Sequence, residues 1–287
     1  MFTKVDNSTD FNLAWKILST HHGEVDDFFK FWPPDKNYFF ASDKNAFVAY
    51  GIRRRVAICL GDPVGSDKSV ALLMKEFGGY CVSRNLTIAF IQSTNRCKKA
   101  DPAGLLRHVL IGADAVINLK RFNSTTVHNK YFRNIVNRFE KHNFSVTTHH
   151  PPHSKALVKE LCQVSDSWLK LPHRKEWSFL TGSFDIDYLQ QMTLHVLRDA
   201  NGKAQAFVNE LPSFKIGVAT IDLMRRLNNA PANCMDFLFI CLMKDRLAEG
   251  YKGFSLGMSP LDGKPYIANR ASKAVHRAYR ISNKPIV

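Results

Sequence analysis

The sequence lacks the features of disulfide-rich, secreted and membrane-spanning proteins. None of its six cysteines forms a Cys-x-x-Cys pair, and Cys59 and Cys241 lie in apolar runs, where a thiol packs as a small hydrophobe. We therefore expect free thiols in a reducing compartment. The first twenty residues lack the apolar core of a signal peptide. The longest apolar run, Phe237–Met243, is far below the roughly 18 residues that cross a bilayer. Any membrane contact is expected to be peripheral.

Acidic residues are also few. The 40 lysines and arginines exceed the 25 acids, which gives a formal net charge of +15. Such an excess concerns partners and solubility rather than fold, and it suits nucleic acid or an anionic membrane surface. A solvated basic face without a partner is the alternative.

Apolar periodicity predicts the order strand, strand, strand, helix, strand, helix twice. The first run comprises Tyr38–Ala41, Phe47–Ile52, Arg55–Leu60, Lys68–Arg84, Thr87–Gln92 and Ala103–Val109, with a further strand at Ala115–Leu119. The second comprises Met192–Arg198, Ala204–Glu210, Lys215–Leu223, Asn233–Glu249, Gly253–Gly257 and Asn269–Arg280. Between them we expect the helices Thr126–Asn143 and Ser154–Leu171, separated by a strand at Phe144–His149.

This order predicts an α/β (α+β) protein with a first half at residues 1–125, a helical linker at 126–175 and a second half at 176–287. Each half resembles the GCN5-related N-acyltransferase fold, so the resemblance implies two tandem folds of that type. In that fold the acyl donor binds beside a strand end and a helix N-terminus, where free N–H groups face phosphate. The corresponding segments here are Gly61–Gly65 and Arg225–Asn233.

The first of these segments contains Gly61, Asp62 and Gly65, which we take as candidate substrate-binding residues. Glycines allow a tight turn and a close approach of the backbone to a ligand. The segment is not a P-loop, because Ser66 and Asp67 separate Gly65 from the next lysine. A purely structural turn from strand to helix is the alternative.

The sharpest motif is Asp222-Leu223-Met224-Arg225-Arg226, which places a carboxylate near a strand end with two guanidiniums directly after it. The carboxylate could orient an amine while an arginine holds phosphate bidentately. Strand alternation predicts Asp222 and Met224 on one face, with Leu223 and Arg225 on the other. A surface cluster of ion pairs is the alternative.

Two further segments carry charge or potential metal ligands. The helix predicted at Thr126–Asn143 has a basic stripe, which suits a phosphate backbone or an ordinary solvated face. The loop His149–His153 is rich in histidine, but no second ligand group has matching spacing, so the sequence predicts no metal. No cofactor is predicted.

Nine ordered segments together carry a family resemblance. They are Tyr38–Ala41, Phe47–Tyr50, Leu60–Gly65, Tyr131–Arg138, Trp177–Phe184, Asp222–Arg226, Ala230–Pro231, Met235–Leu238 and Leu256–Leu261. This set resembles the soluble catalytic domain of the bacterial aminoacyl-phosphatidylglycerol synthases, the phosphatidylglycerol lysyl- and alanyltransferases or multiple peptide resistance factors. The resemblance covers about residues 28–261.

The resemblance implies an aminoacyl-tRNA donor, a phosphatidylglycerol acceptor and a peripheral location on the inner face of the cell membrane. It implies that Asp222 orients the α-amino group of the aminoacyl moiety. Arg225 and Arg226 would hold phosphate or steady the developing oxyanion. Candidate substrate contacts are Arg133 and Arg138, which would follow phosphates, and Asn233 at the start of the helix after the motif.

Two features of the family are not in this sequence. Members usually carry a multi-helix membrane domain before this region, and a Lys-x-Lys-Phe and Trp-containing segment after it. If the second feature supplies lysines to the site, transfer by this chain is expected to be impaired. Two other functions remain open: an acyl-CoA-dependent N-acyltransferase, whose usual glycine-rich loop is missing, and a non-catalytic module that binds tRNA or anionic membrane.

Overall fold

A computed structural model describes residues 9–101, 104, 106–172, 174–176, 179 and 181–260. These residues form two compact units. One unit contains residues 9–36 and 116–255, and the other contains residues 37–115 and 256–260.

The unit that begins at residue 37 is built on a sheet with the order β1-β2-β3-β5, in which β4 also pairs with β2. Its strands are β1 (Asn37–Phe40), β2 (Ala46–Arg53), β3 (Val56–Leu60), β4 (Val64–Gly65) and β5 (Thr87–Ile91). The first three strands are antiparallel, whereas β3 and β5 are parallel. A parallel pair needs a crossover, and α2 (Asp67–Ser83) supplies it.

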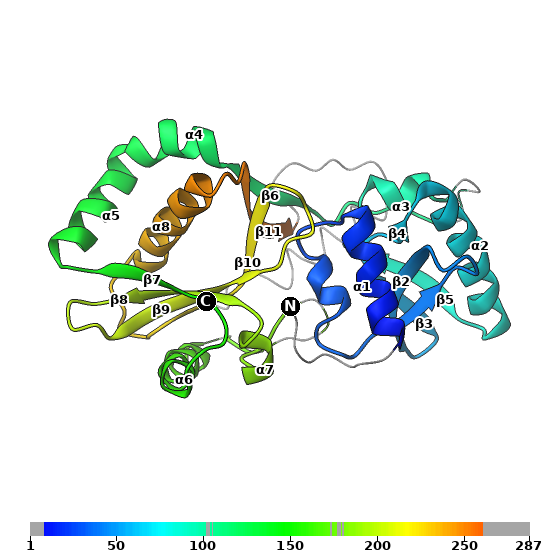
Figure 1. Ribbon diagram of the computed structural model, residues 1–287, viewed down its shortest axis with the longest axis horizontal. Helices are drawn as coiled ribbons and strands as arrows, with labels where there is room; N and C mark the ends of the chain where they lie inside the picture. The colour runs from blue at the N-terminus through cyan, green and yellow to red at the C-terminus, as the bar shows by residue number, and fades with distance from the viewer. Residues whose placement is uncertain are drawn as a thin grey trace, which may run out of the picture. The chain divides into compact units, whose positions relative to one another are not determined.

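The start and the packing of α2 follow from its sequence. Ser66 is the N-cap, and its side chain accepts a hydrogen bond from the Ser69 N–H. Leu73 and Phe77, one helical turn apart, are buried in a core that also contains Ala57 of β3. The helix therefore covers one face of this sheet (Figure 1).

The second sheet has the order β6-β11-β10-β9-β8-β7. Its strands are β6 (Gly112–Asn118), β7 (Ser145–His149), β8 (Thr193–Arg198), β9 (Ala204–Leu211), β10 (Val218–Arg226) and β11 (Gly253–Pro260). Strands β7 to β10 are antiparallel in succession, and β10 and β11 are parallel. Their crossover is α8 (Cys234–Ala248). Both sheets thus contain three antiparallel strands, a crossover helix and a parallel strand, which confirms the predicted pair of tandem acyltransferase-like folds.

Helices lie on both faces of β8, β9 and β10 (Figure 1). On one face, α4 (Leu119–Ser124), the short helix η2 (Thr126–His128), α5 (Lys130–Lys141) and α8 share one apolar core. Within this core the rings of Phe139 and Phe237 stack with their centroids 4.8 Å apart. On the other face lies α6 (Lys155–Leu169).

The N-terminal segment belongs to the same unit as the second sheet. It contains α1 (Thr9–His21) and the short helix η1 (Asp27–Lys30). The ring of Trp15 contacts Phe214 at 5.2 Å between centroids, and Trp32 stacks on Tyr188 of α7 (Ile186–Leu189) at 5.5 Å. Aromatic contacts therefore join the first 36 residues to segments that follow them by more than 150 positions.

Three sequence predictions in the first half and the middle region differ from the structure. The helix predicted at Ala103–Val109 is wrong, since residues 106–109 are not helical and α3 instead occupies Asn95–Lys99, where Thr94 caps it. The predicted strand Ala115–Leu119 is β6, which joins the second sheet. The predicted helix Thr126–Asn143 is interrupted, because Asn129 caps α5 and separates it from η2.

In the second half, the third strand was predicted at Lys215–Leu223 but is β10, which begins and ends three residues later. Gly250 follows α8 with a positive φ of 90°, the left-handed conformation in which a glycine commonly ends a helix. The helix predicted at Asn269–Arg280 lies outside the described residues.

Candidate functional site

Strand β10 carries the candidate catalytic motif, and its pairing is irregular there. Ile221 lies opposite Glu210 and Met224 lies opposite Val208, so β10 has one more residue than β9 between these pairs. This is a β-bulge, which re-aims side chains and is common near active sites. The parallel pairing of β10 with β11 covers only Val218–Thr220 of β10 within the described residues. The motif Asp222–Arg226 therefore lies beyond the part of β10 whose pairing with β11 is described.

The bulge changes which side chains share a face. Simple alternation predicts Asp222 and Arg225 on opposite faces, and this prediction is wrong. The extra residue brings both side chains to the face that carries α6 and α7: Asp222 contacts Tyr188 of α7, and Arg225 contacts Ser165 of α6. Met224 is instead exposed. The carboxylate and the guanidinium thus belong to one site.

The Asp222 carboxylate is held by two donors. Its Oδ2 accepts hydrogen bonds from the Tyr188 hydroxyl at 2.6 Å and from the Gly182 N–H at 2.9 Å. A Cβ on Gly182 would collide with Asp222 and with the Tyr188 ring, so only glycine fits there. None of the described residues donates a hydrogen bond to Oδ1, which leaves one carboxylate oxygen for a ligand.

Asn209 of β9 supports this arrangement. Its Nδ2 donates to the Tyr188 hydroxyl at 3.2 Å, and its Oδ1 accepts from the Leu223 N–H at 2.6 Å. Leu223 lies within the bulge, so the Asn209 amide satisfies a backbone group that the irregular pairing would otherwise leave without a partner. Asn209 therefore fixes both Tyr188 and the backbone next to Asp222.

Burial raises the pKa of the Asp222 carboxyl, while the hydrogen bonds from Tyr188 and Gly182 and the charge of Arg225 oppose that rise. Burial and the neighbouring carboxylate raise the pKa of Tyr188 well above its usual value. Tyr188 thus remains a protonated donor. A carboxyl whose pKa is raised by burial, and whose second oxygen has no donor among the described residues, is a candidate for a functional site.

Arg225 is buried, with 3% of its surface exposed. Its Nη1 donates to Ser165 Oγ at 2.8 Å and its Nη2 to Glu176 Oε1 at 2.7 Å. Its guanidinium also lies 4.6 Å from the centre of the Trp168 ring. Glu176 Oε1 accepts a second hydrogen bond from the Phe184 N–H at 2.8 Å. Arg225 therefore anchors the segment that also contains Gly182.

Arg226 is half-buried, and its Nη1 donates to the Leu227 carbonyl at 3.1 Å. Its charge lowers the pKa of the Cys234 thiol at the start of α8, although burial raises that pKa more. Arg226 thus lies near the beginning of α8 and not with Asp222 and Arg225.

The predicted phosphate contacts on α5 divide into two kinds. Arg133 is exposed. Arg138 is tied to the loop before α8, since its Nη2 donates to Ala232 O and, at 3.3 Å, to Asn233 Oδ1. The Asn233 Nδ2 donates to the Tyr131 hydroxyl at 3.0 Å. The structure therefore shows Arg138 and Asn233 linking α5 to α8, whereas the Arg133 side chain has no hydrogen bond or ion pair with any residue that the structure describes.

Gly61, Asp62 and Gly65 form a compact turn in the unit that begins at residue 37. Asp62 Oδ1 accepts from the Thr94 N–H at 2.9 Å and from the Cys97 N–H at 3.2 Å. Gly65 has a φ of 146°, and a Cβ there would lie 2.6 Å from the Ala46 Cβ. Gly61 likewise has a positive φ, of 64°. These contacts give all three residues a structural role; a role in substrate binding stays a prediction.

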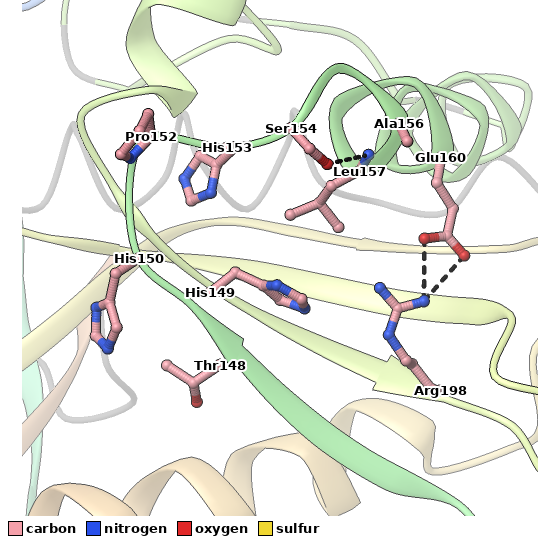
Figure 2. Close-up of a pocket in the computed structure, with 10 residues that line it drawn as sticks. All are labelled: Thr148, His149, His150, Pro152, His153, Ser154, Ala156, Leu157, Glu160 and Arg198. Carbon is pink, nitrogen blue, oxygen red and sulfur yellow. Dashed lines mark hydrogen bonds and ion pairs between the residues drawn. The ribbon is translucent and has the colours of Figure 1, made fainter.

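The histidine-rich loop lies beside a pocket of about 770 Å³ between α6 and the edge strand β7 (Figure 2). Burial and nearby Arg198 lower the pKa of His149. Arg198 in turn is paired with Glu160 at 3.0 Å. His153 Nε2 donates to the Met192 carbonyl at 2.8 Å. Among the described residues, no three His, Cys, Asp or Glu side chains are arranged to hold a metal ion.

Sequence reasoning missed four residues of the site: Glu176, Tyr188, Asn209 and Ser165. Only Asn209 could have been suspected from the sequence, because it is a polar residue in a largely apolar strand, β9. A buried amide of this kind needs a hydrogen-bond partner. The other three come from α6, α7 and the segment between them, and no local pattern connects them to β10.

No helix in the described part of the chain is long and apolar enough to span a bilayer.

Comparisons with known proteins agree with this architecture. Residues 15–282 match the family described as phosphatidylglycerol lysyltransferase, C-terminal. A phosphatidylglycerol lysyltransferase of Bacillus subtilis (strain 168) is 34% identical over 227 residues, which are 79% of this chain and 26% of that protein. The structure of L-PGS from Bacillus licheniformis has a TM-score of 0.81 and 30% identity, and the match covers 96% of this chain and 84% of that one. FemX, at 8% identity and a TM-score of 0.58 over 95% of this chain and 92% of that chain, is similar in fold alone. The chain spans only 26% to 31% of the length of the curated relatives.

Proposed function

Because the chain belongs to the phosphatidylglycerol lysyltransferase C-terminal family, we propose that it moves an aminoacyl group from aminoacyl-tRNA to the glycerol headgroup of phosphatidylglycerol. The observation that carries this proposal is the half-buried Asp222 carboxylate, which has one oxygen held by Tyr188 and Gly182 and the other without a donor among the described residues. An aminoacyl ester brings an α-ammonium group beside its reactive carbonyl. Asp222 would bind that ammonium and so orient the carbonyl.

The reaction is a transesterification. A glycerol hydroxyl of the lipid attacks the carbonyl carbon of the aminoacyl ester, and a new carbon–oxygen bond forms. The bond from that carbon to the ribose oxygen of the tRNA breaks, and this oxygen leaves with the proton of the attacking hydroxyl. Bond making and breaking balance without an oxidant, reductant or cofactor.

Arg225 supports this chemistry indirectly in our proposal. It is bound to Glu176, which holds the Phe184 backbone, and the same segment supplies the Gly182 N–H to Asp222. A planar guanidinium that serves two acceptors and stacks on a tryptophan is not replaceable by lysine. Arg225 is therefore a positioning residue for the carboxylate, and Arg226 remains the candidate to meet substrate phosphate.

The names of the relatives favour lysine as the transferred amino acid. Lysyl-tRNA is a polyanion and phosphatidylglycerol carries one negative charge, so both are in keeping with the net charge of +15. We place Arg133 on the tRNA side, because it is exposed on a basic helix and has no ion pair within the described residues. The site of action we propose is the inner surface of the cell membrane.

The test is direct transfer. Protein is incubated with lysyl-tRNA or alanyl-tRNA and phosphatidylglycerol vesicles, and aminoacylated lipid is separated by thin-layer chromatography. We expect lysyl-lipid from the unmutated chain and far less from Asp222→Asn. Binding of both substrates without any product would contradict the proposal and favour a non-catalytic binding module.

A further inference from the structure

The turn between β2 and β3 presents four consecutive exposed side chains, Ile52, Arg53, Arg54 and Arg55. Arg53 pairs with Val56, so the turn is a tight two-residue hairpin loop. Arg54 has a φ of 55°, a conformation for which such turns prefer asparagine or glycine. Turn chemistry therefore does not explain why arginine occupies this position.

The end of α2 lies at the same end of the sheet. The Thr87 N–H donates to the Arg55 carbonyl at 2.9 Å, and Thr87 pairs with Val56 in the parallel ladder. The residues just before Thr87 include Val82, which is 80% exposed, and Arg84, which is also exposed. We define the basic tip as Ile52, Arg53, Arg54, Arg55, Val82 and Arg84.

No acidic residue balances the basic tip locally. Residues 50–57 and 80–91 contain neither aspartate nor glutamate. In the described part of the chain, Arg53, Arg54 and Arg55 form no ion pair, and the Arg84 guanidinium lies 4.6 Å from the centre of the Tyr80 ring. Four guanidinium groups thus flank two exposed aliphatic side chains, because Ile52 is 49% exposed.

We infer that the basic tip docks the chain on an anionic phospholipid surface. The guanidiniums would bind headgroup phosphates, and Ile52 and Val82 would enter the boundary between headgroups and acyl chains. Proteins commonly bind single-stranded RNA by stacking its bases on aromatic side chains. None of the six side chains of the basic tip is aromatic, which favours a lipid surface over single-stranded RNA. This inference rests on the lipid acceptor of the proposed function and assigns the surface that reaches the lipid.

The experiment measures co-sedimentation of the full chain with vesicles of phosphatidylcholine alone or with one-third phosphatidylglycerol. Each arginine near an anionic surface contributes about fivefold to binding, so replacing Arg53, Arg54 and Arg55 together by glutamine is expected to weaken binding to the phosphatidylglycerol vesicles by about 100-fold. Replacing the same three residues by lysine is expected to preserve most of it. Arg121→Gln is the matched control, since Arg121 is an exposed arginine on α4 whose loss should leave vesicle binding unchanged. Val82→Ser is expected to weaken binding without changing its salt dependence. Melting temperatures confirm that each variant is folded.

Unchanged vesicle binding by the folded triple-glutamine variant would overturn the inference. So would a variant that keeps vesicle binding and loses tRNA binding, because the tip would then be an RNA contact. A second format separates this inference from the proposed function: transfer to phosphatidylglycerol dispersed in detergent micelles needs no docking, so the triple variant should retain it. If the unmutated chain transfers nothing in either format but its vesicle binding depends on the three arginines, the proposed function fails and the docking surface stands.

Discussion

The substitution Asp222→Asn separates binding chemistry from folding at the proposed site. The amide keeps the size of the carboxyl and can still accept hydrogen bonds from Tyr188 and Gly182. It loses the charge that would bind the substrate ammonium. A hydrogen bond to a charged group contributes about 1.5–3 kcal/mol, which corresponds to a loss of about 10- to 150-fold in kcat/KM. We expect the loss in the upper part of this range, because the same partial burial that raises the pKa of Asp222 strengthens its interaction with a bound ammonium.

Stability is expected to change in the opposite direction. The folded state raises the pKa of Asp222 above the ordinary value of 3.8, so it binds more protons than the unfolded chain between these two pKa values. The contribution of Asp222 to the free energy of unfolding is therefore complete below pH 3.8 and is lost as pH rises through the folded pKa. Asparagine cannot ionise, so at neutral pH the melting temperature of the variant should equal or exceed that of the unmutated protein.

The assay is formation of lysyl-lipid and thermal unfolding on the same preparations. Asp187→Asn is the matched control, since Asp187 is an exposed carboxylate on α7, one position before Tyr188. This control should retain full transfer. Full turnover by folded Asp222→Asn protein would remove Asp222 from the site and refute the reasoning.

Three further outcomes are expected. Arg225→Lys should lower both the melting temperature and kcat, because lysine lacks the planar fork that reaches Ser165 and Glu176 and stacks on Trp168. The expected loss is about 1–3 kcal/mol in urea unfolding. Gly182→Ala should impair transfer and destabilise the fold by about 1–3 kcal/mol, since the added methyl group meets Asp222; a stable and fully active variant would contradict the packing described. Arg133→Ala should reduce the slope of log affinity for tRNA against log salt by about one, measured by filter binding at several salt concentrations; an unchanged slope would exclude this arginine as a phosphate contact.

The repeated strand and helix order could be predicted from sequence, because each element carries its own apolar period and the two crossover helices have distinct starts and ends. The limits of β10 could not be predicted. Its central residues include a bulge, and the extra residue is stabilised by the Asn209 amide and not by a local pattern. The prediction that Asp222 and Arg225 face opposite sides failed for this reason.

The roles of individual charged residues were harder to predict than their presence. Arg133 and Arg138 lie five positions apart on one basic helix, yet only Arg138 reaches the loop before α8. A sequence shows the charge of such a side chain, whereas its partner comes from a segment about 95 residues away. The same holds for Asp62, whose acceptors are filled by backbone and side-chain donors of residues 94–97.

The position of the N-terminal segment has a consequence for synthesis of the chain. Residues 9–36 belong to one unit with residues 116–255, so residues 37–115 of the other unit are inserted between the two parts of that unit. Trp15 can contact Phe214, and Trp32 can contact Tyr188, only after more than 150 further residues have been translated. Translation proceeds at about 5–20 residues per second, so roughly ten seconds or more pass before Trp15 and Trp32 can contact these partners. Residues 37–115 are translated in this interval, so residues 9–36 precede them in synthesis but acquire these aromatic partners after them.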